Sequence, residues 1–450
     1  MRIAIVGCSD VGLVTGGCLA AVGHRVTCVD ADPERVRALM PGRVRIHEPL
    51  LADLLAATCS DERLDFTGDL AAAAAQAEAI FICISAPPLE SGDADLSAID
   101  AVARVIASKS SRPKLVIEKS TLPVGTGEEL RRALEVYCQG GGAKFQVVSN
   151  PEFLREGSAV FDFLHPDRIV VGVSELSAAE KMRVIYQPIL EQNFPCPVHD
   201  GNCPPVAPPK FVVTSIISSE LVKPASNSFL AMKISFANEL ADLCERLGAD
   251  VEEVTRAMGM DPRIGPQFLR AGIGFGGFFF PKRIEAFYRL AERAGVDFML
   301  LKEIQQINKN RIDRFMEKAT RALWVLKGKE VGVLGLTFKP QTDDIRSSPA
   351  LEILQRLLAE RSSIRAYDPQ AMPNVRAVFA EVKYCPDAYQ VASGADAMFL
   401  LTEWPEFLEL DWSRIHGLMA RPLVLDGRNL LNPTKMRELG FEYHSIGRPD

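Results

Sequence analysis

Short apolar runs alternate with helix-length segments over the first third of the chain. In order, the runs are "RIAIV", "RVTCV", "AIFICI", "KLVIE" and "FQVVS". Continuous apolar runs of this length are typical of strands buried on both faces, and helices between such strands are typical of parallel βαβ units. The pattern therefore predicts an α/β fold with a doubly wound parallel sheet.

The pattern changes twice in the rest of the chain. Residues 215–319 are mostly helical, because apolar residues recur every three to four positions in "SSELVKPASNSFLAMKISFANELADLCERLG". Pro224 lies inside this pattern and predicts either a kink in the helix or the true start of the helix. A second α/β unit begins at "KEVGVLGLTF" and continues through "SIRAYDP", "AMFLLTEW" and "PLVLDG".

A chain of 450 residues is longer than one hydrophobic core usually serves, so we expect several domains. The stretch 192–210 is rich in proline and has no period, which predicts a loop or linker. We expect a Rossmann domain at 1–205, a helical domain at 215–322 and a Rossmann-like domain at 325–450. A long central helix should join the two Rossmann-like domains.

Composition narrows the possible partners. The net charge of −7 and the pI near 5.6 argue against nucleic acid or an anionic membrane as the main partner. No signal peptide or long apolar span is apparent, so we expect a cytoplasmic protein. The ten cysteines and six histidines are scattered without metal-ligand spacing, which predicts reduced thiols and no metal site.

The stretch "GCSDVGLVTGGCLAAVGHRVTCVD" follows the first predicted strand, where a dinucleotide-binding βαβ unit carries its glycine fingerprint. Gly7 fits the tight turn, Gly12 fits close helix–strand packing, and Asp30 closes the second strand, where it favours NAD over NADP. Ser9 replaces the middle glycine, and Asp10 adds a carboxylate where a pyrophosphate would sit. Two interpretations remain open. Either NAD binding is weakened, or the Rossmann fold is kept for structure, with Asp10 as an N-cap that replaces the charge of the ligand.

Further sequence landmarks extend along almost the whole chain. They are "KSTLPVGT", "NPEFLREGSAVFDFLHPDRIVVG", "KPASNSFLAMKISFANEL", "DPRIGPQFLRAGIGFGG", "GLTFKPQTDDIRSSPALEIL", "TEWPEF" and "VLDGRNL". With these motifs in this order, the chain resembles the UDP-glucose 6-dehydrogenase family of nucleotide-sugar dehydrogenases. Family members use two NAD to oxidise the sugar C6 hydroxyl to a carboxylate, through an aldehyde and a cysteine thioester. The resemblance implies NAD as the cofactor, a homodimer, and a C-terminal half that binds a UDP-sugar.

The resemblance also implies catalytic roles. Thr121 matches a threonine that holds the catalytic water beside the cofactor, and Glu152 and Glu156 match paired glutamates near the reacting carbon and its water. Lys223 and Asn227 lie four positions apart, so they share one face of a helix. An ammonium and an amide on that face would stabilise the oxyanion of an alkoxide or tetrahedral intermediate.

By the same resemblance, the glycine-rich stretch 272–277 closes its main chain over the uridine and the diphosphate. Arg346 matches a contact to NAD, and Arg263 matches an arginine that reaches the substrate of the partner subunit. Lysine and arginine suit a diphosphate because both supply charge-assisted donors. The substrate-binding residues implied in this way are Arg263, Phe268, Gly272, Gly274, Lys339 and Arg428.

Two positions depart from the family pattern. The family reads glycine-glycine-serine-cysteine-phenylalanine-proline-lysine-aspartate where this chain has "GGFFFPKR". Phe279 replaces the cysteine and cannot form a thiohemiacetal or thioester. Arg283 replaces the aspartate, and a guanidinium cannot act as a base. We therefore do not expect the full oxidation to the acid by the family route.

Three hypotheses follow from these losses. The first is a protein that binds a nucleotide sugar, or scaffolds a partner, without the four-electron reaction. The second is an enzyme that oxidises only the alcohol to the aldehyde, using Lys223, Asn227 and a water held by Thr121 and Glu156. The third is an active UDP-glucose 6-dehydrogenase in which other residues replace the missing groups.

Overall fold

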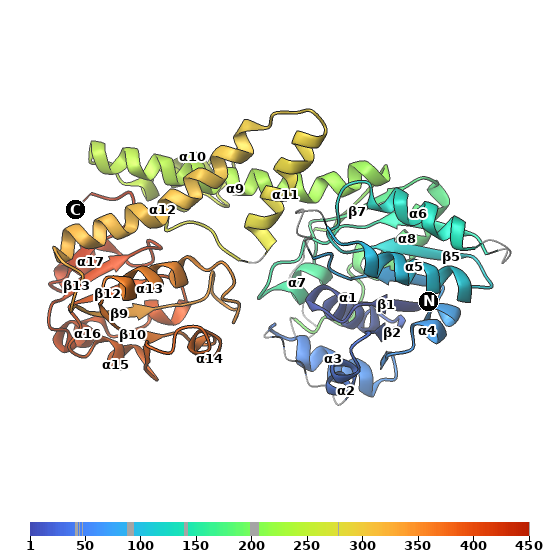
Figure 1. The fold of residues 1–450 in the computed structure, drawn as a ribbon, viewed down its shortest axis with the longest axis horizontal. Coiled ribbons are helices and arrows are strands. Elements are labelled where there is room, and N and C mark those ends of the chain that lie inside the picture. The colour runs from blue at the N-terminus through green and yellow to red at the C-terminus, as the bar shows by residue number, and fades with distance from the viewer. Residues whose placement is uncertain are drawn as a thin grey trace. The chain divides into compact units, whose positions relative to one another are not determined.

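The computed structural model describes residues 1–40, 44, 46, 48–87, 94–138, 143–198, 207–277 and 279–449, apart from the side chain of residue 279. The chain divides into two compact units, Met1–Lys223 and Pro224–Asp450. Each unit contains its own β-sheet (Figure 1).

The first unit is built on an eight-stranded sheet with the order β3-β2-β1-β4-β5-β6-β7-β8. Its first six strands are parallel and follow the order of a dinucleotide-binding fold, whereas β7 runs antiparallel to β6. The five strands predicted from apolar runs are β1, β2, β4, β5 and β6. The strands are β1 (Arg2–Val6), β2 (Arg25–Val29), β3 (Leu64–Thr67), β4 (Ala79–Ile82), β5 (Lys114–Glu118), β6 (Phe145–Ser149), β7 (Arg168–Val173) and β8 (Lys210–Thr214).

Helices cover both faces of this sheet. Along β1, Ile3 and Ile5 belong to one apolar core, and Ala4 and Val6 belong to another. Successive side chains of a strand point to opposite faces, so two cores on opposite faces require an apolar residue at every position. The helices are α1 (Asp10–Ala21), α2 (Pro33–Leu39), α3 (Leu51–Ser60), α4 (Leu70–Gln76), α5 (Ser97–Lys109), α6 (Thr126–Tyr137), α7 (Ala159–Leu164) and α8 (Leu176–Leu190).

A long helix, α9 (Ile216–Leu247), carries the chain from the first unit into the second. It continues through Pro224, so the prediction that Pro224 marks the start of the helix is wrong. The alternative prediction of a kink at Pro224 stays a prediction. The described parts of the predicted linker, 192–198 and 207–209, contain no helix or strand, and 199–206 lie outside the described residues.

The second unit contains a six-stranded parallel sheet with the order β11-β10-β9-β12-β13-β14. Its strands are β9 (Glu330–Leu334), β10 (Ser363–Tyr367), β11 (Lys383–Tyr384), β12 (Ala397–Leu400), β13 (Leu423–Asp426) and β14 (Glu442–His444). Its helices are α10 (Val251–Gly259), α11 (Phe279–Arg293), α12 (Met299–Leu323), α13 (Pro349–Ala359), α14 (Met372–Arg376), α15 (Ala388–Ala392), α16 (Trp412–Leu418), α17 (Pro433–Glu438) and the short 3₁₀ turn η1 (Pro405–Leu408). The prediction of two Rossmann-like units joined by a long helix is confirmed.

The two sheets share a turn and a carboxylate at equivalent places. Gly7 follows β1 with φ of +102°, and Gly335 follows β9 with φ of +88°. Asp30 after β2 accepts a backbone N–H from the turn after β1, and Asp368 after β10 accepts one from the turn after β9. In the second unit the Asp368 carboxylate is fully buried and also accepts the Trp404 indole N–H at 3.1 Å.

None of the described helices has the length and apolar composition needed to cross a lipid bilayer. Over the same residues, no cluster of three or more His, Cys, Asp or Glu side chains is arranged to hold a metal ion.

Candidate functional site

The turn between β1 and α1 keeps the geometry of a dinucleotide-binding turn. Gly7 has a φ of +102°, and a Cβ there would lie 2.7 Å from the Cys83 carbonyl oxygen at the end of β4. A Cβ on Gly12 would lie 1.8 Å from the Gly7 carbonyl oxygen. Both positions therefore require glycine, as predicted: the first for the turn and the second for close packing of helix on strand.

Ser9 and Asp10 do not have the roles predicted for an aspartate N-cap. Ser9 occupies the N-cap position of α1 and Asp10 is the first helical residue, so the N-cap prediction for Asp10 is wrong. The Ser9 hydroxyl donates to the Cys83 carbonyl at 3.2 Å and makes no capping bond. Its backbone is extended, with φ of −80° and ψ of −179°, a conformation that does not need glycine. The turn therefore accommodates Ser9, and Asp10 adds negative charge to the first turn of the helix.

Asp30 holds a buried carboxylate at the end of β2. It accepts the backbone N–H groups of Cys8 at 2.8 Å and Asp32 at 2.9 Å, and it pairs with the Arg35 guanidinium at 3.1 Å. A dinucleotide fold places the adenosine ribose at this strand end. Arg35 was not predicted from the sequence, although its place at the start of α2, only five positions after Asp30, was an available signal.

Thr121 supplies an independent test of whether a cofactor fits. It follows β5, and its hydroxyl oxygen is buried without a hydrogen-bond partner among the described residues. Buried polar groups normally find a partner, so this hydroxyl fits a polar ligand or a water. With Asp30 for the ribose and the Gly7 turn for the pyrophosphate, these residues fit a nicotinamide dinucleotide, apart from the carboxylate of Asp10.

Glu152 and Lys223 form a buried ion pair in the first unit. The Lys223 Nζ lies 3.2 Å from Glu152 Oε2, and the side chains are 8% and 5% exposed respectively. The same carboxylate oxygen accepts the Leu154 N–H at 2.7 Å, and Lys223 Nζ lies 5.3 Å from the centre of the Phe153 ring. Buried ion pairs persist only where hydrogen bonds fix them, so Glu152 and Lys223 are held in one geometry. Two of the predicted catalytic residues are thus brought together.

A second buried lysine, Lys119, lies close to this pair and was not predicted. Its Nζ donates to Asn150 Oδ1 at 3.2 Å and to the Tyr186 hydroxyl at 3.4 Å. Burial lowers the pKa of Lys119 to about 8, and the nearby charge of Lys223 lowers it further, while Cys83 and Glu152 oppose the shift. Because Lys119 precedes Thr121 by two positions and Asn150 precedes Glu152 by two, their hydrogen bond links the two strand ends that carry predicted site residues.

The loop after Thr121 is held by a pair of buried carboxyl groups. Glu220 on α9 accepts the N–H groups of Gly125 at 2.6 Å and Gly127 at 2.8 Å. Burial raises the pKa of Glu118 well above its usual value, and the adjacent Glu220 carboxyl adds to the rise. The raised pKa favours the protonated form of the Glu118 carboxyl. Of the other predicted residues, Glu156 is half-buried beyond β6, and Asn227 lies one turn after Lys223 on α9.

In the second unit, the glycines of the segment 272–277 are needed for packing within the protein. A Cβ at Gly272 would lie 2.9 Å from the Gly427 carbonyl oxygen, and one at Gly276 would lie 2.3 Å from the Ser347 carbonyl oxygen. Gly274 and Gly277 have φ of +98° and +89°. The segment therefore lies directly on the loops at the carboxyl ends of the second sheet, the edge where open α/β sheets bind ligands.

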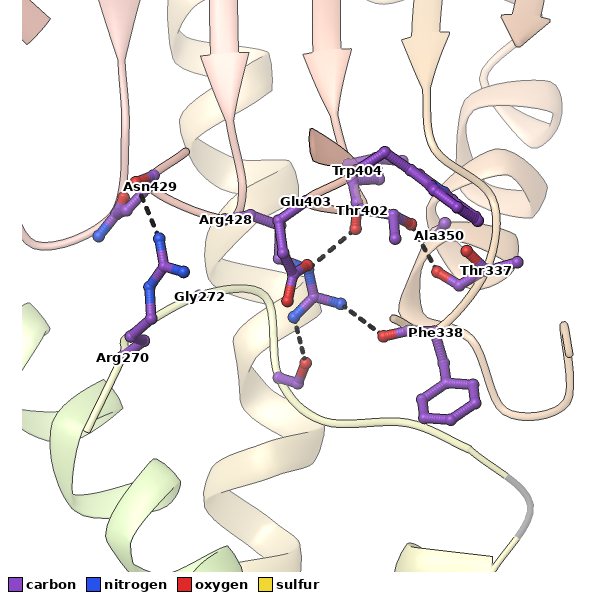
Figure 2. Close-up of polar contacts among 12 residues, drawn as sticks. Arg270, Gly272, Thr337, Phe338, Ala350, Thr402, Glu403, Trp404, Arg428 and Asn429 are labelled. Atoms are coloured by element: carbon purple, nitrogen blue, oxygen red, sulfur yellow. Dashed lines mark hydrogen bonds and ion pairs between the residues drawn. The ribbon is translucent and has the colours of Figure 1, made fainter. Parts of the chain in front are cut away.

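Arg428 holds this segment from the side of the sheet. Its guanidinium donates to the carbonyls of Leu401 at 2.9 Å, Gly274 at 2.9 Å and Phe338 at 3.4 Å, and its Nε lies 3.4 Å from Glu403 Oε2. Figure 2 shows the Arg428 side chain reaching between the glycine segment and Phe338. Burial lowers the pKa of Arg428, and Glu403 opposes that shift. The Arg428 guanidinium thus donates its hydrogen bonds to backbone carbonyls and holds the segment in position.

Asparagines on two helices hold the same segment from the opposite side. Asn308 on α12 accepts the Phe275 N–H at 2.8 Å and donates to the Phe275 carbonyl at 3.0 Å. Asn238 on α9 accepts the Gly272 N–H at 2.8 Å. Buried Arg311 donates to the Gly272 carbonyl at 3.3 Å and is itself fixed by Asp242 at 2.7 Å. None of these residues was predicted, because they lie more than thirty positions from the segment.

The other predicted contacts lie on the surface of the second unit. Arg263 pairs with Asp261 at 2.6 Å and its side chain is 87% exposed, and Arg346 pairs with Asp344 at 2.6 Å. Two predicted residues remain. Lys339 is half-buried, with its Nζ 5.8 Å from the centre of the Phe338 ring, and Phe268 is partly exposed with φ of +63°.

The two positions where the sequence departs from the expected family pattern lie at the start of α11. Phe279 is the first residue of the helix, but its side chain, like all of Phe278, lies outside the described residues. Arg283 is half-buried in the second turn of the same helix, and the first turn contains no acidic residue. The helix N-terminus and Arg283 therefore both contribute positive character to this end of α11.

Comparison with known proteins agrees with this arrangement. Three models of the UDP-glucose/GDP-mannose dehydrogenase family match in order: the NAD binding domain at 1–190, the central domain at 217–310 and the UDP binding domain at 332–433. UDP-glucose 6-dehydrogenase TuaD of Bacillus subtilis (strain 168) is 40% identical over 449 residues, which cover all of this chain and 93% of the relative. UDP-glucose 6-dehydrogenase of Rhizobium meliloti (strain 1021) is 42% identical over 454 residues, which cover both chains fully.

Solved structures match over the same length. A UDP-glucose dehydrogenase from the archaeon Pyrobaculum islandicum superimposes with a TM-score of 0.86 at 37% identity, covering all of this chain and 96% of the other. The likeness thus extends through both sheets and the helices between them. The chain belongs to the UDP-glucose/GDP-mannose dehydrogenase family.

Proposed function

We propose that this chain binds a UDP-sugar and does not carry out the four-electron oxidation of UDP-glucose to UDP-glucuronate. The observation that carries the proposal is the stretch "GGFFFPKR", in which Phe279 and Arg283 take the places of the cysteine and the aspartate. Without a thiol there is no covalent intermediate for the second oxidation, and loss of a nucleophile with its supporting group costs many orders of magnitude in rate.

The UDP-sugar is proposed to bind at the segment 272–277. This segment is supported by Asn238, Asn308 and Arg428 without any ligand, so little ordering is needed for binding. Lys339 supplies a cation for the diphosphate, and Arg428 acts by positioning the segment. Gly272, Gly274, Phe268 and, from the other subunit of a dimer, Arg263 complete the proposed contacts.

NAD is proposed to bind weakly at the first unit. Gly7, Gly12, Asp30 and Thr121 would hold it, with Arg346 as a further contact. NAD supplies the hydride acceptor when it is bound. The carboxylate of Asp10 disfavours the pyrophosphate because both are negative and share the N-terminus of α1.

An active two-electron oxidoreductase is the second candidate, and the buried Glu152–Lys223 pair favours it. Transfer of one hydride from the C6 carbon, with loss of the hydroxyl proton, needs no thiol. Lys223 and Asn227 would stabilise the alkoxide, and Thr121 and Glu156 would hold a water. A full UDP-glucose 6-dehydrogenase remains the third candidate.

One series of measurements separates the candidates. Calorimetric titrations with UDP-glucose, UDP-glucuronate and NAD are followed by NADH absorbance with sugar and NAD together. Binding of the UDP-sugar without NADH supports the proposal, about one NADH per sugar supports the two-electron enzyme, and about two per sugar supports the full dehydrogenase. Arg283→Asp is the comparison variant. If the Arg283 guanidinium lies at the sugar end, this change should weaken the binding of UDP-glucuronate, which carries a carboxylate, more than the binding of UDP-glucose.

A homodimer is proposed on the basis of α9. Phe229, Phe236 and Leu243 recur every seven positions on this helix and are 60%, 53% and 51% exposed. Large apolar side chains in one such row are typical of a helix that packs on a partner. We also propose the three domains 1–205, 215–322 and 325–450. The cytoplasm is the proposed location, since the described cysteines are all free thiols.

A further inference from the structure

A thiol, an imidazole and an amide form a hydrogen-bonded chain in the first unit, and none of these three groups has been given a functional role above. The Sγ of Cys196 lies 3.2 Å from His165 Nε2, and His165 Nδ1 lies 2.6 Å from Gln192 Oε1. His165 follows α7, and Gln192 and Cys196 follow α8. A nucleophile, a base within hydrogen-bond reach and a third group that orients the base are the signature of an activated nucleophile.

The orientation of Gln192 fixes the tautomer of His165. The Gln192 Nε2 donates to the carbonyls of Leu164 at 3.0 Å and Ile189 at 2.6 Å, so the amide oxygen is the atom that faces the imidazole. An oxygen acceptor at Nδ1 requires the proton of the neutral ring to be on Nδ1. Nε2 is then the unprotonated nitrogen and accepts the thiol proton of Cys196.

The other described cysteines have different surroundings. Among the described residues, Cys196 is the one cysteine whose sulfur is hydrogen-bonded to an imidazole. Burial raises the pKa of Cys18 well above its usual value and that of Cys83 to about 12. Cys138, which is half-buried, is bonded to the Ala143 carbonyl at 3.3 Å, and a carbonyl cannot take up a proton.

Cys196 also lies close to the protein surface. Its side chain is 4% exposed, but Pro195 before it is exposed and Pro197 after it is half-buried. This stretch contains no helix or strand that would have to open for a small reagent to reach the sulfur. A hydroperoxide such as hydrogen peroxide is small enough to use such a route, whereas bulky electrophiles are disfavoured.

We propose that Cys196 is an oxidation site for hydroperoxides, with His165 as its general base. The Nε2 atom of His165 takes the thiol proton, and the sulfur attacks one peroxide oxygen. The S–O bond forms as the O–O bond breaks, so the sulfur loses two electrons and the peroxide gains them. The imidazolium returns its proton to the leaving oxygen, which gives water or an alcohol and leaves a sulfenic acid on Cys196. This site is independent of the proposed binding of a UDP-sugar.

The test is to treat the full-length protein with hydrogen peroxide, trap sulfenic acids with dimedone, and measure the labelling rate of each cysteine by peptide mass spectrometry. Trypsin leaves Cys196 and Cys203 together in the peptide 184–210, so the experiment uses a Cys203→Ser background. We expect Cys196 to be labelled at least about tenfold faster than Cys138, because a positioned general base contributes roughly 10²–10⁴-fold. Labelling of Cys196 at or below the rate of Cys138 overturns the proposal, and needs no further variant.

His165→Phe tests the base itself. Phenylalanine keeps an aromatic ring beside Phe161 and Phe194, whose centres lie 5.1 Å and 5.8 Å from the His165 ring, but it cannot take a proton. The Cys196 rate should fall about tenfold or more while the Cys138 rate stays constant. An unchanged Cys196 rate in a variant with the wild-type melting temperature rejects His165 as the base. If this variant has a lowered melting temperature, Gln192→Leu is used in its place. This change removes the acceptor that keeps the His165 proton on Nδ1 and leaves the thiol unchanged, so the Cys196 rate should again fall, and an unchanged rate again counts against the proposal.

Discussion

Asn308 offers the sharpest test of how the proposed nucleotide site is built. Both polar atoms of its amide are used on one peptide unit, the N–H and the carbonyl of Phe275. Asn308→Ala removes the two hydrogen bonds and leaves both backbone groups without a side-chain partner. The change affects the position of the segment 272–277, not any atom that would touch a ligand directly.

The magnitude follows from the two bonds. Each net hydrogen bond contributes about 1 kcal/mol, so holding the segment in place is worth about 2 kcal/mol. At about 1.4 kcal/mol per factor of ten, the UDP dissociation constant should rise by up to roughly thirtyfold. This value is an upper limit, because the measured affinity falls only in proportion to the fraction of molecules in which the segment has left its binding position. Asn308→Asp keeps the acceptor for the N–H but loses the donor, so its effect should lie between those of wild type and Asn308→Ala.

The assay is calorimetric titration of UDP, which contains the uridine and diphosphate but no sugar. Asn310→Ala is the matched control, because Asn310 lies on the same helix and, among the described residues, its side chain accepts an exposed hydrogen bond from Gln306. The control should bind UDP as the wild type does. If Asn308→Ala also binds UDP with unchanged affinity and melts normally, the segment does not depend on Asn308 and our account of the site is incorrect.

Three further predictions concern stability and assembly. Glu118→Gln should raise the melting temperature more at pH 8 than at pH 5. The pKa of Glu118 is raised in the folded protein, so the folded state loses stability as the pH rises above the ordinary carboxyl pKa of about 4.3, and glutamine, which does not titrate, avoids this loss. An equal gain at both pH values refutes this. Phe236→Asp should turn the proposed dimer into a monomer in sedimentation velocity, and an unchanged mass excludes this face of α9 from the interface. Gly276→Ala should cost about 1–3 kcal/mol in denaturant unfolding, since its Cβ would lie 2.3 Å from a carbonyl oxygen. Gly417→Ala, which has open space around it, should cost nothing.

Local pattern was sufficient to predict the fold. In β1, alternate residues enter two cores, so the run "RIAIV" is apolar throughout and reveals a strand buried on both faces. The prediction failed where a local rule competed with a tertiary one. Pro224 breaks a local helix rule, yet α9 continues through it from Ile216 to Leu247. Asp10 satisfies the composition rule for a cap, but Ser9 takes the N-cap position.

The site was predictable only where its residues lie in short motifs. Gly7, Gly12 and Asp30 follow from one βαβ unit, and the structure places them as that unit requires. Asn308 and Arg428 reach the glycine segment from 33 and 154 positions away, so no local spacing reveals that they meet there. Sequence motifs therefore identified the groups proposed to meet the ligand, Arg428 among them, and missed Asn238 and Asn308, which hold the segment.

This division bears directly on what the chain has lost and kept. Phe279 and Arg283 are the positions proposed to have lost groups of the chemical step, whereas Asn238, Asn308 and Arg428 support the segment 272–277. Buried donors and acceptors that lose their partners are costly, so such a network is either kept whole or abandoned. In this chain the network around the segment 272–277 is whole. Gly276 likewise leaves no space for a side chain beside the Ser347 carbonyl, so the segment is tightly positioned, which supports our proposal that it holds a nucleotide.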